Sequence, residues 1–132
     1  MVPGMPDSAE KLRVLLVEDD RDLADVTRMG LEMEGLDVSV AYDGREALAV
    51  VERVHPDVVI TDLIMPVLDG LQLIQQLLSR PAPRSPVIAI SAVGSRLRTA
   101  RELGAVEALV KPVHPKELAA CARKAWRRAH DR

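Results

Sequence analysis

The sequence has little of what nucleic-acid-binding or disulfide-stabilised proteins depend on. Among its 132 residues there is no Phe, one Trp and one Tyr, which removes the usual stacking platforms for single-stranded nucleic acid. The net charge of −2 gives no basic surface for a phosphate backbone. A single cysteine, Cys121, excludes an internal disulfide and fits a reducing cytoplasm. We therefore expect no nucleic-acid binding by this chain alone.

Membrane and secretion signals are missing as well. The longest apolar runs are too short to span a bilayer, and residues 1–11, MVPGMPDSAEK, lack the basic start and apolar centre of a signal peptide. With 48% hydrophobic and 29% charged residues, the composition is that of a globular chain. We expect a cytoplasmic location without membrane association, a flexible N-terminal segment over 1–11 and one domain over 12–130.

Short apolar runs alternate with helical patterns along the chain. The runs are rich in Val and Ile and carry few charges, which is typical of strands buried on both faces of a parallel sheet. They are Val14–Val17, Val38–Ala41, Val58–Thr61, Val87–Ile90 and Ala108–Val110. Five β-then-α units in this order predict a doubly wound α/β sheet.

The segments between the strands are expected to be amphipathic helices, because apolar residues recur in them every three or four positions. The sets are Leu23, Val26, Gly30 and Met33; Ala47, Val51 and Val54; Leu71, Ile74 and Leu78; and Leu118, Cys121, Ala122 and Ala125. Gly35, His55-Pro56 and Gly104 mark helix ends. The stretch from Ser91 to Gly104 leaves about two turns for the fourth helix.

Three further acidic residues have structural explanations. Asp20 and Asp69 stand just before helical patterns and are expected to be N-caps. Asp43-Gly44 is interpreted as a turn into the second helix.

Polar side chains follow four of the five predicted strands. Glu18 and Asp19 come after the first, Asp62 after the third, Ser91 after the fourth and Lys111 after the fifth. In open parallel sheets, functional groups gather at the carboxyl ends of the strands.

Neighbouring carboxylates repel one another unless they are protonated or bind a cation. An all-oxygen set favours Mg²⁺. With Asp62 as nucleophile, and with lysine and hydroxyl donors opposite, the set suits formation of an aspartyl phosphate.

Four motifs in this order resemble the receiver domain of bacterial two-component response regulators: VLLVEDD (14–20), DLIMPVLDG (62–70), ISA (90–92) and LVKP (109–112). The resemblance covers roughly residues 12 to 130 and implies a flavodoxin-like (βα)5 fold with strand order 2-1-3-4-5. It implies a switch that accepts a phosphoryl group from a sensor histidine kinase or a histidine phosphotransfer protein. Such a switch acts on a downstream target and turns over no separate substrate.

The resemblance also implies a role for each residue at the strand ends. Asp62 is the phosphoacceptor. The Mg²⁺ ligands are Glu18 (through water), Asp19, Asp62 and the backbone carbonyl of Ile64. The groups that contact the phosphoryl oxygens are Ser91, the Ala92 amide and Lys111. The Lys111-Pro112 peptide bond is expected to be cis, as such bonds are a proline speciality.

Three positions depart from the usual pattern of the family. Ala108 stands where the family usually has a Tyr or Phe that swings inward, so the ordinary aromatic switch is not available. Ile64 and Val93 are apolar and cannot orient an attacking water by hydrogen bonding, so we expect slow self-dephosphorylation. Ala108 leaves open a degenerate receiver that serves only as an interaction module. A phosphate-ester hydrolase is disfavoured because Ile64 replaces the second Asp that such enzymes commonly use.

Overall fold

The Val- and Ile-rich segments pair as strands in the computed structural model, which describes residues 11–81 and 84–131. The strands are β1 (Arg13–Val17), β2 (Asp37–Ala41), β3 (Val58–Asp62), β4 (Val87–Ser91) and β5 (Glu107–Val110). All neighbours are parallel, in the order β2-β1-β3-β4-β5. The predicted strands are confirmed to within one residue at each end, and so is the strand order. The segment expected to be flexible, 1–11, lies outside the described residues except for Lys11.

Helices follow every strand. They are α1 (Arg21–Met33), α2 (Gly44–Val54), α3 (Gly70–Leu78), α4 (Gly94–Leu103) and α5 (Pro115–His130). The side chains of Asp20, Asp43 and Asp69 each accept a hydrogen bond from the backbone of the first turn that follows, which satisfies amide groups left without a helical partner. The N-caps predicted at Asp20 and Asp69 are therefore confirmed.

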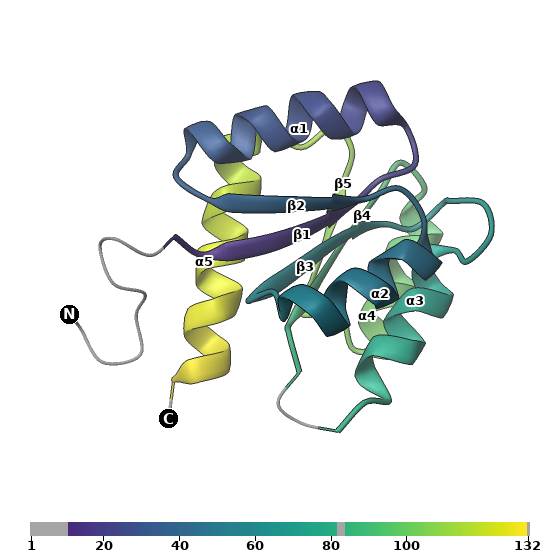
Figure 1. Ribbon diagram of the computed structural model, residues 1–132. Helices are drawn as coiled ribbons and strands as arrows, with labels where there is room; N and C mark the ends of the chain where they lie inside the picture. Colours follow the sequence, from purple (N-terminus) through teal and green to yellow (C-terminus); the bar gives the residue numbers. More distant parts are fainter. Residues whose placement is uncertain (1–10, 82–83, 132) are drawn as a thin grey trace.

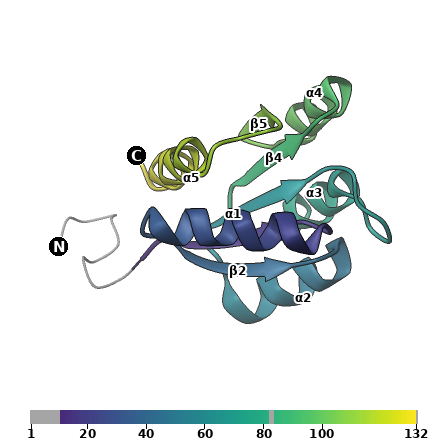
Figure 2. The same cartoon turned by 90° about the horizontal axis from the view of Figure 1, so that it is seen from above.

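The sheet is covered by helices on both faces, with α1 and α5 on one side and α2, α3 and α4 on the other (Figures 1 and 2). Alternate residues of the strands point to opposite faces. On β1, for example, Leu15 packs in the cluster beneath α2–α4, whereas Leu16 packs in the cluster beneath α1 and α5. Two apolar layers therefore hold the sheet, and the carboxyl ends of its strands lie at one edge.

The predicted apolar face of α1 is wrong. Val26 is 64% exposed and Met33 is 86% exposed, while Ala24 and Leu31 are the buried residues of this helix. Ala24 and Leu31 lie seven residues apart and share a face, so two stripes of the same period compete in this segment. The stripe of Ala24 and Leu31 is the one that the core buries, whereas most of the predicted stripe is left at the surface.

The fourth helix is also longer than expected. It contains 10 residues, or nearly three turns, and ends at Gly104 in a left-handed conformation as predicted. Among the described residues, no helix has both the length and the apolar character needed to cross a membrane.

Candidate functional site

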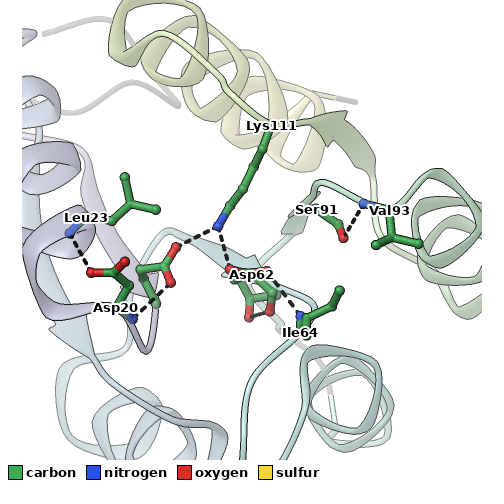
Figure 3. A network of polar contacts seen from close by, with 9 residues as sticks. Asp20, Leu23, Asp62, Ile64, Ser91, Val93 and Lys111 are labelled. Atoms are coloured by element: carbon green, nitrogen blue, oxygen red, sulfur yellow. Dashed lines mark hydrogen bonds and ion pairs between the residues drawn. The ribbon is translucent and has the colours of Figure 1, made fainter.

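The carboxyl ends of β1, β3 and β5 bring three charged side chains together (Figure 3). The Nζ atom of Lys111 lies 2.6 Å from Oδ2 of Asp62 and 2.9 Å from Oε1 of Glu18. Asp62 and Glu18 are buried, at 6% and 3% exposure. A charge removed from water needs a partner of opposite sign, and Lys111 supplies it to both carboxylates at once.

The electrostatics of the pair follow from burial and from these contacts. Burial raises the pKa of Glu18, although the hydrogen bonds from Lys111 and from the Asp20 backbone oppose this. Burial also acts against the charge on Lys111, but the hydrogen bonds and negative charges of Asp62 and Glu18 outweigh it and raise the pKa of the ammonium. Lys111 is therefore held firmly in its charged form, whereas Glu18 is held less firmly in its own.

Backbone amides orient the two buried carboxylates. The N–H of Ile64 donates to Oδ1 of Asp62 over 3.1 Å, and the N–H of Asp20 donates to Oε2 of Glu18 over 3.1 Å. Sequence reasoning did not find these donors, because any residue type except proline supplies an amide. The local signal is indirect: each donor stands two residues after its carboxylate, a spacing at which acidic side chains commonly bond the backbone.

The acidic residues form a set that fits a divalent cation. One carboxylate oxygen each from Glu18, Asp19 and Asp62 lies within 4.8 Å of the others. Asp19 is exposed, so the set opens to solvent on one side. Hard oxygen donors with room for water suit Mg²⁺, which keeps several waters when it binds proteins. The structure thus brings together the three side chains predicted to act on the metal.

Ser91 and Lys111 are joined through the ends of their strands. The backbone N–H of Lys111 donates to the carbonyl of Ser91 over 3.0 Å. The Ser91 hydroxyl is fully buried and accepts a hydrogen bond from the N–H of Val93, 3.1 Å away (Figure 3). Its own O–H is still available as a donor. Ala92 is exposed beside it, and the Lys111-Pro112 bond is cis, as predicted.

Aliphatic side chains lie near the charged centre. Ile64 and Val93 are 49% and 41% exposed, each two residues beyond a predicted site residue. Ala108 is partly buried and packs against the cluster beneath α2–α4, so its position is occupied by a methyl group without a rotamer to change.

A separate hollow of about 580 Å³ lies at the other edge of the sheet. Its lining includes His55, Arg80, Arg84 and His130, and none of the predicted site residues. Size alone does not decide which concavity carries chemistry. The paired carboxylates and lysine at the strand ends make the stronger candidate site.

Comparisons with known proteins point to one family. The profile of the response regulator receiver domain matches residues 14–123. The probable transcriptional regulator ycf27 of Porphyridium aerugineum is 40% identical over 122 residues, which are 90% of this chain and 50% of that protein. The transcriptional regulatory protein CpxR of Escherichia coli K12 is 39% identical over 120 residues, 89% of this chain and 50% of that protein. The chain thus spans about half the length of these curated relatives.

Solved structures agree with the sequence matches. The receiver domain of the Francisella response regulator 1452 superimposes with a TM-score of 0.82 at 31% identity, covering 89% of this chain and 98% of that one. The chemotaxis response regulator CheY4 of Vibrio cholerae gives a TM-score of 0.79 at 27% identity, covering 88% of this chain and 99% of that one.

Proposed function

This chain belongs to the response regulator receiver domain family, and from that premise we propose that it is a phosphoacceptor switch in which Asp62 takes up the phosphoryl group. The observation that carries the proposal is the buried Asp62 carboxylate, which lies 2.6 Å from the Lys111 ammonium and within 4.8 Å of the Glu18 and Asp19 carboxylates. A nucleophilic carboxylate with a fixed cation beside it is what formation of an aspartyl phosphate needs.

The transfer step forms one bond and breaks one. An Asp62 carboxylate oxygen attacks phosphorus, and the bond from phosphorus to a partner's histidine nitrogen breaks, so the imidazole leaves with the electron pair. We propose a sensor histidine kinase or a histidine phosphotransfer protein as the physiological donor. A small acyl phosphate serves in its place through cleavage of its phosphorus–oxygen bond, with the carboxylate leaving.

The surrounding residues have separate tasks. Lys111 compensates the negative charge that arrives with the phosphoryl group, and the Ser91 hydroxyl and the Ala92 amide donate to its oxygens. Glu18, Asp19, Asp62 and the Ile64 carbonyl would hold Mg²⁺. When bound, the ion neutralises charge on the phosphoryl oxygens.

The aliphatic neighbours bear on how long the phosphoryl group stays. Ile64 and Val93 are exposed and offer no side-chain donor or acceptor to align a water molecule. We propose slow self-dephosphorylation, with loss of radiolabelled phosphate in Mg²⁺ as the measurement. A half-life of seconds would contradict it.

The position of the switch in a longer pathway is proposed from the relatives. The curated relatives are transcriptional regulators about twice as long as this chain, so the downstream target could include DNA only through parts beyond this domain. We propose that the domain works in the cytoplasm, a compartment that keeps cysteine thiols such as that of Cys121 reduced.

The proposal is tested by mass spectrometry of the intact protein. Incubation with Mg²⁺ and acetyl phosphate is expected to add one phosphoryl mass, and the Asp62→Asn variant is expected to add none. An adduct of unchanged yield in Asp62→Asn would refute the assignment. No adduct with either a small donor or a cognate kinase would identify the chain as an interaction module instead. Steady release of phosphate from many esters would identify a hydrolase.

A further inference from the structure

The segment that follows Asp62 is held at both ends. This segment, residues 64–69, is called the acceptor loop below. At its start, the N–H of Ile64 donates to Asp62 Oδ1. At its end, Asp69 forms a capping box with Gln72 at the start of α3. The conformation between these anchors decides where the Ile64 carbonyl points, and that carbonyl is one of the proposed Mg²⁺ ligands.

The backbone in the middle of the acceptor loop adopts a conformation that its residue type disfavours. Val67 has φ of 70°, a left-handed conformation that is unfavourable for a β-branched residue. Its side chain is 71% exposed, so burial of Val67 does not hold it in place. Other contacts of the loop must impose this conformation.

One such contact comes from the first residue of α2. A Cβ atom on Gly44 would lie 2.5 Å from the carbonyl oxygen of Leu68 and 2.7 Å from its Cβ. These two atoms belong to or adjoin the backbone, and they cannot move aside by a rotamer change. Gly44 is itself buried. Only glycine at this position lets the acceptor loop rest against the start of α2.

The glycines that begin α3 and α4 differ from each other in the space around them. A Cβ on Gly94, at the start of α4, would meet nothing within 4 Å. A Cβ on Gly70, at the start of α3, would overlap the backbone carbonyl of Asp62 itself. The acceptor strand and loop are thus in close contact with the first residues of α2 and α3, whereas the first residue of α4 leaves room for a side chain.

We propose that Gly44 is a positioning residue for phosphoryl transfer, which acts through Leu68 on the acceptor loop and thereby on Mg²⁺ binding beside Asp62. The proposal rests on the proposed function for the role of the loop. It adds a residue of the second helix, outside all four motifs at the strand ends. A methyl group at position 44 pushes the Leu68 backbone outward, and the loop carries the Ile64 carbonyl with it.

The test measures Mg²⁺ binding and loop exchange, and needs no phosphorylation. Calorimetry on Gly44→Ala is expected to show Mg²⁺ binding about 10-fold weaker, the effect typical of losing support behind a metal ligand. Hydrogen–deuterium exchange without metal is expected to be faster across residues 63–70. Gly94→Ala is the matched control, because its added methyl group meets open space, and it is expected to bind Mg²⁺ like the wild type.

A second control separates positioning from general loss of stability. Leu36→Ala leaves a cavity in the cluster on the α1 and α5 side of the sheet, so it destabilises the fold without touching the loop. Unchanged Mg²⁺ affinity in Gly44→Ala, or an equal loss of affinity in Leu36→Ala, would overturn the proposal.

If Gly44→Ala does not fold, Leu68→Gly tests the same contact from the loop side, because it removes the Leu68 Cβ and side chain that lie against Gly44. It is expected to weaken Mg²⁺ binding and speed loop exchange, and wild-type behaviour would again overturn the proposal. Failure of Asp62 to accept phosphate would sink the proposed function but would leave these binding and exchange results to be judged independently.

Discussion

Lys111 contacts two buried carboxylates with a single side chain. Strands in a sheet lie about 4.8 Å apart, and β4 stands between β3 and β5, so a short residue after β5 would not reach Asp62. The long lysine side chain crosses this gap and contacts both Asp62 and Glu18. The sequence places a cation at this edge, but only the three-dimensional arrangement shows that it is shared between two carboxylates.

The raised pKa of Glu18 predicts a pH dependence of stability. In the unfolded chain the carboxyl keeps its ordinary value of 4.5, and in the folded chain burial raises the pKa. The stabilisation from its protonated form is therefore fully present below about 4.5 and is lost as pH rises through the folded value. Without metal, the wild type is expected to gain stability relative to Glu18→Gln as pH falls from 7 toward 4.5.

Urea unfolding of both proteins in a chelating buffer at a series of pH values measures this difference. A difference that stays constant, or that moves in favour of Glu18→Gln at low pH, would contradict the assignment of burial as the dominant cause. Saturating Mg²⁺ is expected to reverse the trend, because the metal and the proton compete for the carboxylate.

Val67 is a residue where replacement by glycine is expected to help. Relief of the left-handed strain is worth about 1–3 kcal/mol, and the added freedom of the unfolded chain costs about 0.4–1 kcal/mol. Val67→Gly is therefore expected to raise the free energy of unfolding by about 1 kcal/mol, as measured by urea denaturation. Val67→Ala keeps a Cβ in the left-handed region and is expected to gain less. A loss of stability in Val67→Gly would show that the valine side chain itself holds the loop.

At the scale of elements, the strands were predictable and the orientation of α1 was not. A strand buried on both faces is apolar throughout, so its position does not depend on which face is which. A helix needs one face chosen from several. In α1 the stripe containing Val26 and Met33 has more apolar surface, while Ala24 and Leu31 fit the space available. The periodicity of a sequence shows that a helix has an apolar stripe. It does not show how much space the rest of the fold leaves for that stripe.

Two substitutions on α1 test this orientation. Met33→Gln changes a side chain that is mostly in solvent, and is expected to alter the free energy of unfolding by no more than about 0.5 kcal/mol. Leu31→Ala empties a fully buried position and is expected to cost about 2–5 kcal/mol. Chemical denaturation of the two variants decides the matter. A cost for Met33→Gln comparable to that of Leu31→Ala would restore the face expected from periodicity.

The candidate site was more predictable than the packing of α1, because its residues depend on topology rather than on fine fit. Parallel strands must end at a common edge, so the residues that follow them lie close together whichever side chains fill the core. What remained hidden were backbone groups and small residues. The amides of Ile64 and Asp20, and the space left by Gly44, have no sequence signature of their own, since their effect comes from where the backbone runs.

At the scale of the whole molecule, the carboxylates at the strand ends and the two apolar clusters have opposite effects on the stability of the fold. The clusters stabilise the sheet from both faces, while Glu18, Asp19 and Asp62 gather negative charge at one end of it. Such a site lowers the stability of the empty fold and raises its affinity for a cation. A ligand that binds only the folded state stabilises it, by about 2.7 kcal/mol at 100 times its dissociation constant.

The wild type and Asp19→Asn are therefore expected to differ in thermal stability in opposite directions with and without Mg²⁺. Saturating Mg²⁺ is expected to raise the Tm of the wild type by several degrees. Asp19→Asn removes one of the three clustered charges, so in a chelating buffer it is expected to melt at or above the wild-type temperature. With Mg²⁺ it is expected to melt below the wild type, because it has lost a metal ligand. An equal Mg²⁺-induced shift in the two proteins would remove Asp19 from the metal site, and no shift in either would mean that the acidic edge of this sheet does not bind the ion.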